Sequence, residues 1–391
     1  MDIDQLRAAT AGCARVVHLN NAGSALPTTR TLDTVINHLR LEAAIGGYEA
    51  ADRERPRLDA FYPSAARLIG ARPDEIAFVE NATRAWDMAF YSLRFGAGDR
   101  ILTCRSEYSS NYIAYLQTAR KAGCEIVVVP DDEHGQIDVA ALANLIDSRA
   151  KLISINHVPT QGGQVQPADA VGKVANAAKI PYLLDACQSV GQLPVDVSAI
   201  GCDFLSVTGR KYLRGPRGTG FLYARRETTA DIEPVMLDNH AARWTGANTY
   251  ATMPGAVRFE NWERYFAGAL GLAAAIDQAN ELGIDAIWAR IRLLADGLRA
   301  RLADLPGVSL TDLGATKGGI VTFAMADIDH DELKTKLRAR GVNVSVSTRF
   351  SSRLDLEARD LETVMRASVH VYNTETELDR LVAEIGLARR G

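Results

Sequence analysis

The sequence predicts an α/β protein whose larger part is a mostly parallel β-sheet with helices on both faces. From residue 100 onward, short apolar runs such as 126–129 and 152–155 alternate with segments of helical pattern. These runs are continuously apolar, which is typical of strands buried on both faces of a parallel sheet. With 391 residues, 47% of them hydrophobic, the chain is long enough for one large and one small domain.

The first half of the chain supplies most of the predicted sheet. We expect helices at 5–17 and 27–45, with a short strand and loop at 18–23 between them. The remaining predicted strands are 76–79, 101–103, 126–129, 152–155, 182–184, 204–206 and 221–223, and the helices between them begin near 82 or span 109–122, 138–147 and 167–179. In such a sheet, ligands bind beyond the carboxyl ends of the strands.

The last third of the chain has a different pattern, typical of a smaller α+β unit. Two long helices rich in Ala and Leu are predicted within 256–304. After them we expect strands at 320–325, 342–346 and 365–371, helices at 330–339 and 375–388, and a loop at 347–360. The predicted division is an N-terminal segment (1–20) that packs with the small domain, a large domain (21–255) and a small domain (256–391).

Composition excludes several classes of function. The net charge of −4 and the pI near 6.0 give no basic field for nucleic acid or membrane surfaces. No apolar run is long enough to span a bilayer. Residues 1–4 are acidic and lack the basic start, followed by an apolar stretch, of a signal peptide. Five scattered cysteines show no metal-binding spacing. We therefore expect a cytoplasmic protein with reduced thiols and no bound metal.

Lys211 lies in the stretch most suggestive of chemistry. Residues 206–220 combine this lysine with glycines, hydroxyls and arginines, between two apolar runs that read as strands. Unlike arginine, a lysine can lose its proton and attack a carbonyl. A solvated basic turn is the ordinary alternative. A nucleotide phosphate loop does not fit, because a strand follows the glycines and Tyr212 follows the lysine.

Three more polar clusters follow predicted strands, at 80–83, 107–111 and 185–188. The first opens a helix and could bind an anion, although Asn81 could simply cap the helix. Asp185 ends a buried strand and needs a cationic partner, unless it only caps a turn. Tyr108 could stack on a flat ring or pack in the core. Together with Lys211, a phosphate cradle, an aromatic face and a carboxylate for a ring nitrogen indicate pyridoxal 5′-phosphate.

With these motifs the chain resembles the class V aminotransferases of the fold-type I pyridoxal-phosphate enzymes. This family includes cysteine desulfurases, selenocysteine lyases, isopenicillin N epimerase-like proteins and the C–S lyase of ergothioneine synthesis. The resemblance extends from 18–23 to 366–374. It implies a large domain with a seven-stranded, mostly parallel sheet that binds the cofactor, and a small C-terminal α+β domain. It also implies a homodimer that acts on a small amino acid at the subunit interface.

The resemblance also implies a role for each matched residue. Lys211 would form the Schiff base and move the α-proton, Asp185 would pair with the ring nitrogen, and Tyr108 would stack on the ring. Arg366 would clamp the substrate carboxylate. The other implied cofactor contacts are Ala82, Thr83, Gln188, Thr208 and Arg210, the other substrate contacts are Thr160, Asn21 and Arg349, and a partner chain would add Asn248 or Thr249 near the phosphate.

Two departures from the desulfurases guide the functional prediction. Those enzymes carry a cysteine in the loop that corresponds to 347–355, and this chain has none there. The Val-Pro-Thr stretch within 157–163 and residues 258–263 are closer to the epimerase and C–S lyase branch. Cys187 is interpreted as a packing residue. The sequence therefore predicts a C–S β-lyase that forms pyruvate and ammonia, with an aminotransferase, an epimerase or a non-catalytic binding protein as alternatives.

Arg349 and Arg353 lie in the loop that usually faces the substrate. Two arginines there could recognise a distal acid, such as a carboxylate or sulfinate. The alternative is a pair of solvated arginines on a surface loop.

Overall fold

A computed structural model describes residues 1–389 of the chain. Its largest sheet has seven strands, as the sequence predicted. In spatial order they are β2 (Ile76–Val79), β8 (Gly220–Ala224), β7 (Phe204–Thr208), β6 (Tyr182–Asp185), β5 (Ala150–Asn156), β3 (Arg100–Thr103) and β4 (Glu125–Val128). Strand β8 runs antiparallel to both its neighbours, and the other pairs are parallel. The predicted fold-type I α/β architecture is confirmed.

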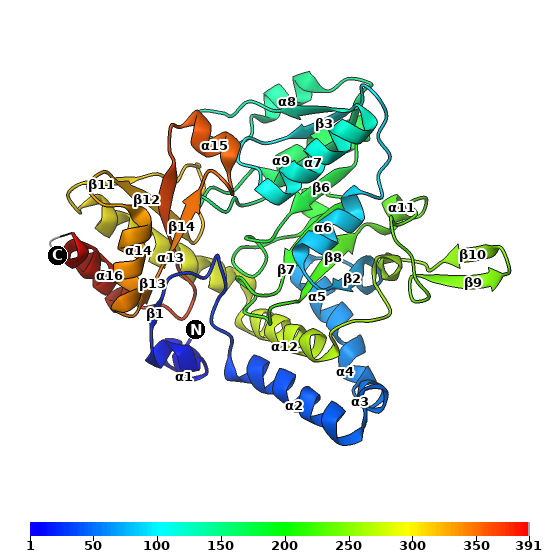
Figure 1. Cartoon of the computed structure of the whole chain (residues 1–391), viewed down its shortest axis with the longest axis horizontal. Coiled ribbons are helices and arrows are strands. Elements are labelled where there is room, and N and C mark those ends of the chain that lie inside the picture. The colour runs from blue at the N-terminus through cyan, green and yellow to red at the C-terminus, as the bar shows by residue number, and fades with distance from the viewer. Residues whose placement is uncertain (390–391) are drawn as a thin grey trace.

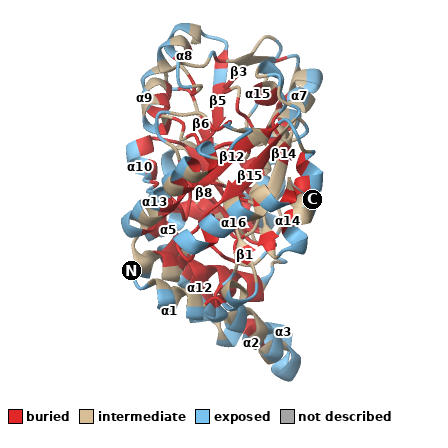
Figure 2. Ribbon diagram, turned by 90° about the vertical axis from the view of Figure 1, so that its left-hand side faces the viewer, coloured by how far each residue is buried: buried red, intermediate tan, exposed pale blue. Residues whose placement is uncertain are grey.

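Both faces of this sheet are buried, which explains the continuous apolar runs (Figure 2). Successive strand residues point to opposite faces, so Leu183 and Leu184 enter different hydrophobic clusters. Leu183 packs with Trp86 and Tyr115 from the helices of one face. The helices that follow the strands are α6 (Ala82–Phe90), α7 (Ser109–Ala122), α8 (Val139–Leu145), α9 (Ala168–Ala178) and α10 (Val197–Ile200).

A second, four-stranded antiparallel sheet is built from the last third of the chain. Its order is β11 (Val308–Leu310), β12 (Ile320–Met325), β15 (Thr363–Ser368) and β14 (Ser345–Thr348). Helices α13 (Ile284–Ala303), α14 (His330–Ala339) and α16 (Glu375–Ala388) pack beside it (Figure 1). Helix α12 (Phe266–Leu282) instead packs on α2 (Thr29–Ile45) and α5 (Phe61–Ile69). The domain boundaries at 20 and 255 stay a prediction.

The segment before α2 crosses to the second sheet. After α1 (Ile3–Ala8), strand β1 (Val17–His18) pairs in parallel with β13 (Val342–Asn343). The predicted helix at 5–17 is wrong beyond Ala8, where a 3₁₀ turn (Ala11–Ala14) follows. An ion pair of 2.8 Å between Arg7 and Glu377 adds a contact between α1 and α16. This path brings residues 19–26 between the two sheets.

Several elements were not predicted from the sequence. Helices α3 (Gly47–Arg53), α4 (Arg55–Asp59) and α11 (Arg226–Thr229) were missed. So was the hairpin of β9 (Ala242–Gly246) and β10 (Thr249–Thr252), which projects from the body of the molecule in Figure 1. Helix α15 (Arg353–Ala358) lies inside the stretch predicted as a loop. Among the described helices, none is long and apolar enough to cross a membrane.

Candidate active site

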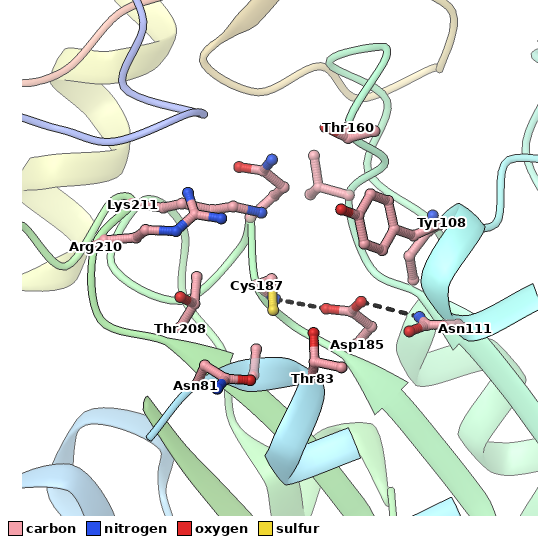
Figure 3. Close-up of a pocket in the computed structure, with 14 residues that line it drawn as sticks. Asn81, Thr83, Tyr108, Asn111, Thr160, Asp185, Cys187, Thr208, Arg210 and Lys211 are labelled. Carbon is pink, nitrogen blue, oxygen red and sulfur yellow. Dashed lines mark hydrogen bonds between the residues drawn. The ribbon is translucent and has the colours of Figure 1, made fainter. Parts of the chain in front are cut away.

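A pocket lies at the carboxyl ends of β2, β3, β5, β6 and β7, where the predicted polar clusters converge (Figure 3). Parallel strands end at the same edge, so clusters far apart in sequence meet there. The predicted residues that line the pocket are Ala82, Thr83, Tyr108, Thr160, Asp185, Gln188, Thr208, Arg210 and Lys211. Asn81, Asn111, Asn156, Val158 and Cys187 complete the lining.

The amino end of α6 forms one side of the pocket. Asn81 caps this helix by accepting a 2.9 Å hydrogen bond from the Arg84 N–H, so capping and an anion site coexist here. The free N–H groups at a helix start favour an anion such as a phosphate. Gly220 allows the close approach of α6 to the sheet, because a Cβ there would lie 3.2 Å from the Asn81 carbonyl carbon and 3.3 Å from the Ala82 nitrogen. Thr208 and Arg210 lie across from α6 in Figure 3.

Lys211 projects into the pocket from the loop after β7. Burial lowers the pKa of its ammonium group to about 8, and the positive charges of Arg210 and Arg366 act in the same direction. Asp185 partly opposes this shift. No salt bridge holds the amine within residues 1–389. Lys211 therefore loses its proton more readily than an exposed lysine, as a carbonyl-attacking amine requires.

The loop that carries Lys211 forms hydrogen bonds to the N-terminal segment around residues 23–26. The Ala25 N–H donates to the Arg210 carbonyl over 2.9 Å, and the Arg210 side chain donates to the Gly23 carbonyl. Arg214 adopts a left-handed backbone (φ 61°) and donates from Nε to the Leu26 carbonyl over 2.9 Å. Its guanidinium also lies 4.7 Å from the centre of the Tyr372 ring. These contacts fix the position of the loop that carries Lys211.

Asp185 is held at the end of β6 by two donors. The Cys187 N–H donates to its Oδ1 over 2.9 Å, and the Asn111 amide donates to its Oδ2 over 3.0 Å (Figure 3). Asn111 was not singled out from the sequence. The signal that could have found it is its spacing, four residues after Glu107 and within the first turn of α7.

Tyr108 and Gln188 both line the pocket. Tyr108 stands at the cap position of α7, and 36% of its surface remains exposed, so its ring is open to the pocket. The Gln188 amide donates to the Ala22 carbonyl over 3.2 Å, whereas its Oε1 is buried without a partner. A buried polar atom is costly unless a ligand or water satisfies it.

Arg366 is buried on β15 and reaches the pocket wall at Thr160. It donates from one terminal nitrogen to the Thr160 carbonyl (3.0 Å) and hydroxyl (2.8 Å), and from the other to Asn20 Oδ1 (3.3 Å). Its Nε is buried without a partner among the described residues. Burial lowers the pKa of the guanidinium to about 10, so it stays charged at neutral pH. A free donor on a held arginine suits a carboxylate.

Two predicted substrate contacts lie elsewhere. Asn21 is fully buried outside the pocket, and its amide donates to the Ser368 carbonyl over 2.7 Å. Its neighbour Asn20 is the residue that meets Arg366. Arg349 does not line the pocket, and it forms ion pairs with Glu362 (2.6 Å) and Asp360 (3.5 Å). Arg353 pairs with Glu357 on the surface of α15.

Comparison with known proteins identifies the family. The family model described as Aminotransferase class-V matches residues 17–381. The chain belongs to the class-V aminotransferase family. A probable cysteine desulfurase of Methanothermobacter thermautotrophicus is 30% identical over 359 residues, which cover 91% of this chain and 90% of that protein. One from Halalkalibacterium halodurans is 31% identical, over 86% and 81% of the two chains. The solved cysteine desulfurase CsdA of Escherichia coli has the same fold (TM-score 0.92, 23% identity, 99% and 98% coverage).

As a class-V aminotransferase family member with this pocket, the chain is a pyridoxal-phosphate enzyme, as the sequence predicted. The residues fit the cofactor. A lysine with a lowered pKa suits the aldehyde, the start of α6 suits the phosphate, and Asp185 suits a protonated ring nitrogen. The unpartnered Gln188 Oε1 marks a place where a ligand would supply a hydrogen bond. In the described residues no cluster of metal-binding side chains occurs.

The predicted C–S β-lyase activity is wrong. Relatives that are 27–31% identical to this protein, over most of its length, are named cysteine desulfurases. The prediction depended on a cysteine missing from 347–355 and on the likeness of 157–163 and 258–263 to the lyase branch, and the comparison over most of the chain outweighs both. The pocket geometry could not have decided the question, because one cofactor cradle serves several reactions and the choice depends on which substrate bond lies perpendicular to the ring.

Proposed function

We propose that this enzyme removes the sulfur atom of L-cysteine and leaves L-alanine. The observation that carries the proposal is the match to proteins named cysteine desulfurases over about nine-tenths of both chains. The pocket supports it, since it holds a lysine with a lowered pKa and a buried carboxylate, and Arg366, which has a free donor, bonds to Thr160 of its lining. A small α-amino acid fits that set of groups.

Each side chain then has a defined task. Bound pyridoxal phosphate supplies an aldehyde that captures amines and a ring that withdraws electrons. Lys211 takes and returns the α-proton, which its lowered pKa allows near neutral pH. Arg366 binds the substrate carboxylate, while Thr160 and Asn20 hold its guanidinium in place. Asp185 accepts a hydrogen bond from the ring nitrogen.

The sulfur acceptor is a thiol from outside the chain in this proposal. Cys104, Cys124 and Cys202 are buried in the cores, and Cys13 lies outside the pocket lining. Cys187 lines the pocket, but burial and the neighbouring Asp185 raise the pKa of its thiol, which keeps it protonated. The balanced reaction is cysteine + RSH → alanine + RSSH. The C–S bond breaks, an S–S bond forms, and the thiol proton ends on the alanine methyl group.

Product analysis tests this proposal. Cofactor-loaded enzyme is mixed with L-cysteine, with and without a small dithiol, and alanine, sulfide, pyruvate and ammonia are measured. We expect alanine and sulfide, increased by the dithiol, and no added sulfur on any of the five cysteines by mass spectrometry. Lys211→Ala should abolish alanine formation, whereas Lys173→Ala, at a side chain 78% exposed, should not. Pyruvate in place of alanine would refute desulfuration, and sulfur bound to Cys187 would refute the external acceptor.

We also infer a homodimer, in which the projecting hairpin of β9 and β10 meets a second copy. Large apolar side chains are exposed on and near this hairpin, with Trp244 82% exposed. Exposed apolar patches of this kind mark interaction surfaces. Asn248 and Thr249, at its turn, remain predicted phosphate contacts for the partner chain. Light scattering should give twice the chain mass. Trp244→Ser should weaken the dimer, whereas Leu293→Ser, at a residue 62% exposed on α13, should not.

The predicted cytoplasmic location is part of this proposal. All five cysteines are free, which suits a reducing compartment. Fractionation of cells that express the tagged protein would test it, and recovery from an oxidising compartment would contradict it.

A further inference from the structure

A second buried carboxylate, Glu107, lies behind Asp185. It is only 4% exposed and accepts hydrogen bonds at both oxygens. Oε1 accepts from the Tyr108 N–H (2.7 Å) and Asn111 (3.0 Å), and Oε2 accepts from the hydroxyls of Thr103 (3.1 Å) and Tyr115 (3.2 Å). Within residues 1–389, no arginine, lysine or histidine forms a salt bridge with it. A buried carboxylate without a cation is unusual and needs an explanation.

Asn111 joins the two acids. Its Nδ2 donates to Glu107 Oε1 and to Asp185 Oδ2, each over 3.0 Å. An amide nitrogen carries two hydrogens in one plane, so each carboxylate receives one of them. Because Cys187 N–H holds the other oxygen of Asp185, the carboxylate is fixed in rotation and faces the pocket (Figure 3).

The two negative charges favour a cation in the pocket. Burial and the charge of Asp185 raise the pKa of Glu107 to about 7, although the donors from Tyr108, Asn111 and Thr103 oppose this. The other titratable groups that sense the Glu107 charge are Cys104 and Tyr115, and both remain protonated because burial raises their pKa. A positive charge next to Asp185 would stabilise both acids in their ionised forms. A protonated pyridine nitrogen supplies such a charge.

We propose that Glu107 and Asn111 are positioning residues, which act through Asp185 to keep the ring nitrogen of the bound cofactor protonated. Glu107 adds a second negative charge on the far side of Asp185, and Asn111 aligns the two carboxylates. This role does not depend on which bond of the substrate is broken, so it stands apart from the proposed desulfuration. It differs from a purely structural role, in which Glu107 would only accept hydrogen bonds from α7 and β3.

A cofactor analogue separates these two roles. In deazapyridoxal phosphate a carbon atom replaces the ring nitrogen, so the analogue cannot carry the ring charge. Glu107→Gln removes the negative charge, and its amide can still bond to the hydroxyls of Thr103 and Tyr115, which can accept as well as donate. The matched control is Tyr115→Phe, which removes the hydroxyl that bonds to Glu107 and Ser154 and removes no charge.

The experiment measures the dissociation constants of both cofactors from wild type, Glu107→Gln, Asn111→Ala and Tyr115→Phe by absorbance titration of the cofactor-free proteins. We expect Glu107→Gln and Asn111→Ala to bind pyridoxal phosphate about tenfold more weakly than wild type, which is the equivalent of one pKa unit. Both variants should bind the analogue as tightly as wild type does. Tyr115→Phe should not distinguish the two cofactors. Equal weakening for both cofactors, or no weakening in Glu107→Gln, would overturn the proposal. Thermal melts of the cofactor-free proteins confirm that each variant folds. If Asn111→Ala does not fold, Asn111→Ser takes its place.

Discussion

At the scale of single residues, the site depends on burial that changes the charge of specific groups. Lys211 has a pKa lowered to about 8, and Glu107 has a pKa raised to about 7, both chiefly because they are removed from water. Groups with strongly shifted pKa values in and next to one pocket are typical of catalytic sites. The consequences can be measured before any substrate is known.

Lys211 gives a prediction for pH dependence. Only the unprotonated amine can attack the cofactor aldehyde, and its share falls about tenfold for each pH unit below the pKa. Capture of pyridoxal phosphate by the cofactor-free protein should therefore accelerate as the pH rises to about 8 and then level off. Stopped-flow absorbance measures this rate, with Lys173→Ala as the control. A rate that keeps rising to the ordinary lysine pKa would contradict the prediction.

Arg366 gives a prediction for substrate binding. Arg366→Lys keeps the positive charge but loses the planar fork that Thr160 and Asn20 hold. A charge-assisted hydrogen bond contributes about 1.5–3 kcal/mol, so KM for the amino acid should rise by about tenfold or more. Steady-state kinetics test this against Arg353→Lys, whose side chain is 67% exposed and paired with Glu357. An unchanged KM would mean that Arg366 does not bind the carboxylate.

Most residues in the pocket were predictable, because each follows a strand and the carboxyl ends of parallel strands meet. The exceptions have physical reasons. Asn111 ends the predicted polar cluster, and its spacing after Glu107 does not show that it also reaches Asp185. Asn20 and Asn21 are adjacent, and only the path of the chain between the sheets decides which one meets Arg366. The clamp and proton roles of the matched residues stay predictions.

At the scale of elements, the buried strands were predictable and the exposed ones were not. Strands β5 and β6 are mostly apolar and almost entirely buried, because both faces of the sheet are covered. The hairpin of β9 and β10 is exposed along most of its length, so no burial pattern marks it. Helix α15 is only 6 residues long, and its sequence is rich in charged residues, a pattern that is typical of a surface loop. Short exposed elements depend on tertiary contacts that the sequence does not display.

The approach of α6 to the sheet gives a prediction at this scale. Gly220→Ala would place a methyl group 2.4 Å from the Val207 oxygen and 3.3 Å from the Ala82 nitrogen. Such overpacking costs about 1–3 kcal/mol, and it should also move the helix start away from the phosphate. We expect a lower melting temperature and weaker binding of pyridoxal phosphate. Gly162→Ala, where no atom lies within 4 Å, is the control. Wild-type affinity in Gly220→Ala would argue against the phosphate role of α6.

At the scale of the whole molecule, residues 17–26 connect the two sheets. Their backbone pairs with β13, receives the Ser368 N–H at the Leu19 carbonyl, and bonds to the lysine loop at Ala25. Lys211 and Arg366 are therefore both positioned by this short segment.

Asn21→Ala tests this connection. The change removes the donor to the Ser368 carbonyl and the acceptor of the Tyr372 hydroxyl, both buried. Each unsatisfied buried group costs about 1–3 kcal/mol, so the melting temperature should fall clearly. Asn280→Ala, which loses one partly buried bond to the Ser64 carbonyl, should have a smaller effect in the same calorimetric measurement. Equal effects would show that the segment is not a special junction.

The crossing of the N-terminal segment also sets an order for biosynthesis. A ribosome makes Val17 long before its strand partner Val342, and Asn20 long before Arg366. All seven strands of the large sheet leave the ribosome first, and N-terminal regions fold first during translation. The nascent chain thus carries Lys211 and Asp185 before Arg366 is made. If Arg366 is the carboxylate clamp, as proposed, the cofactor can be bound before a substrate amino acid.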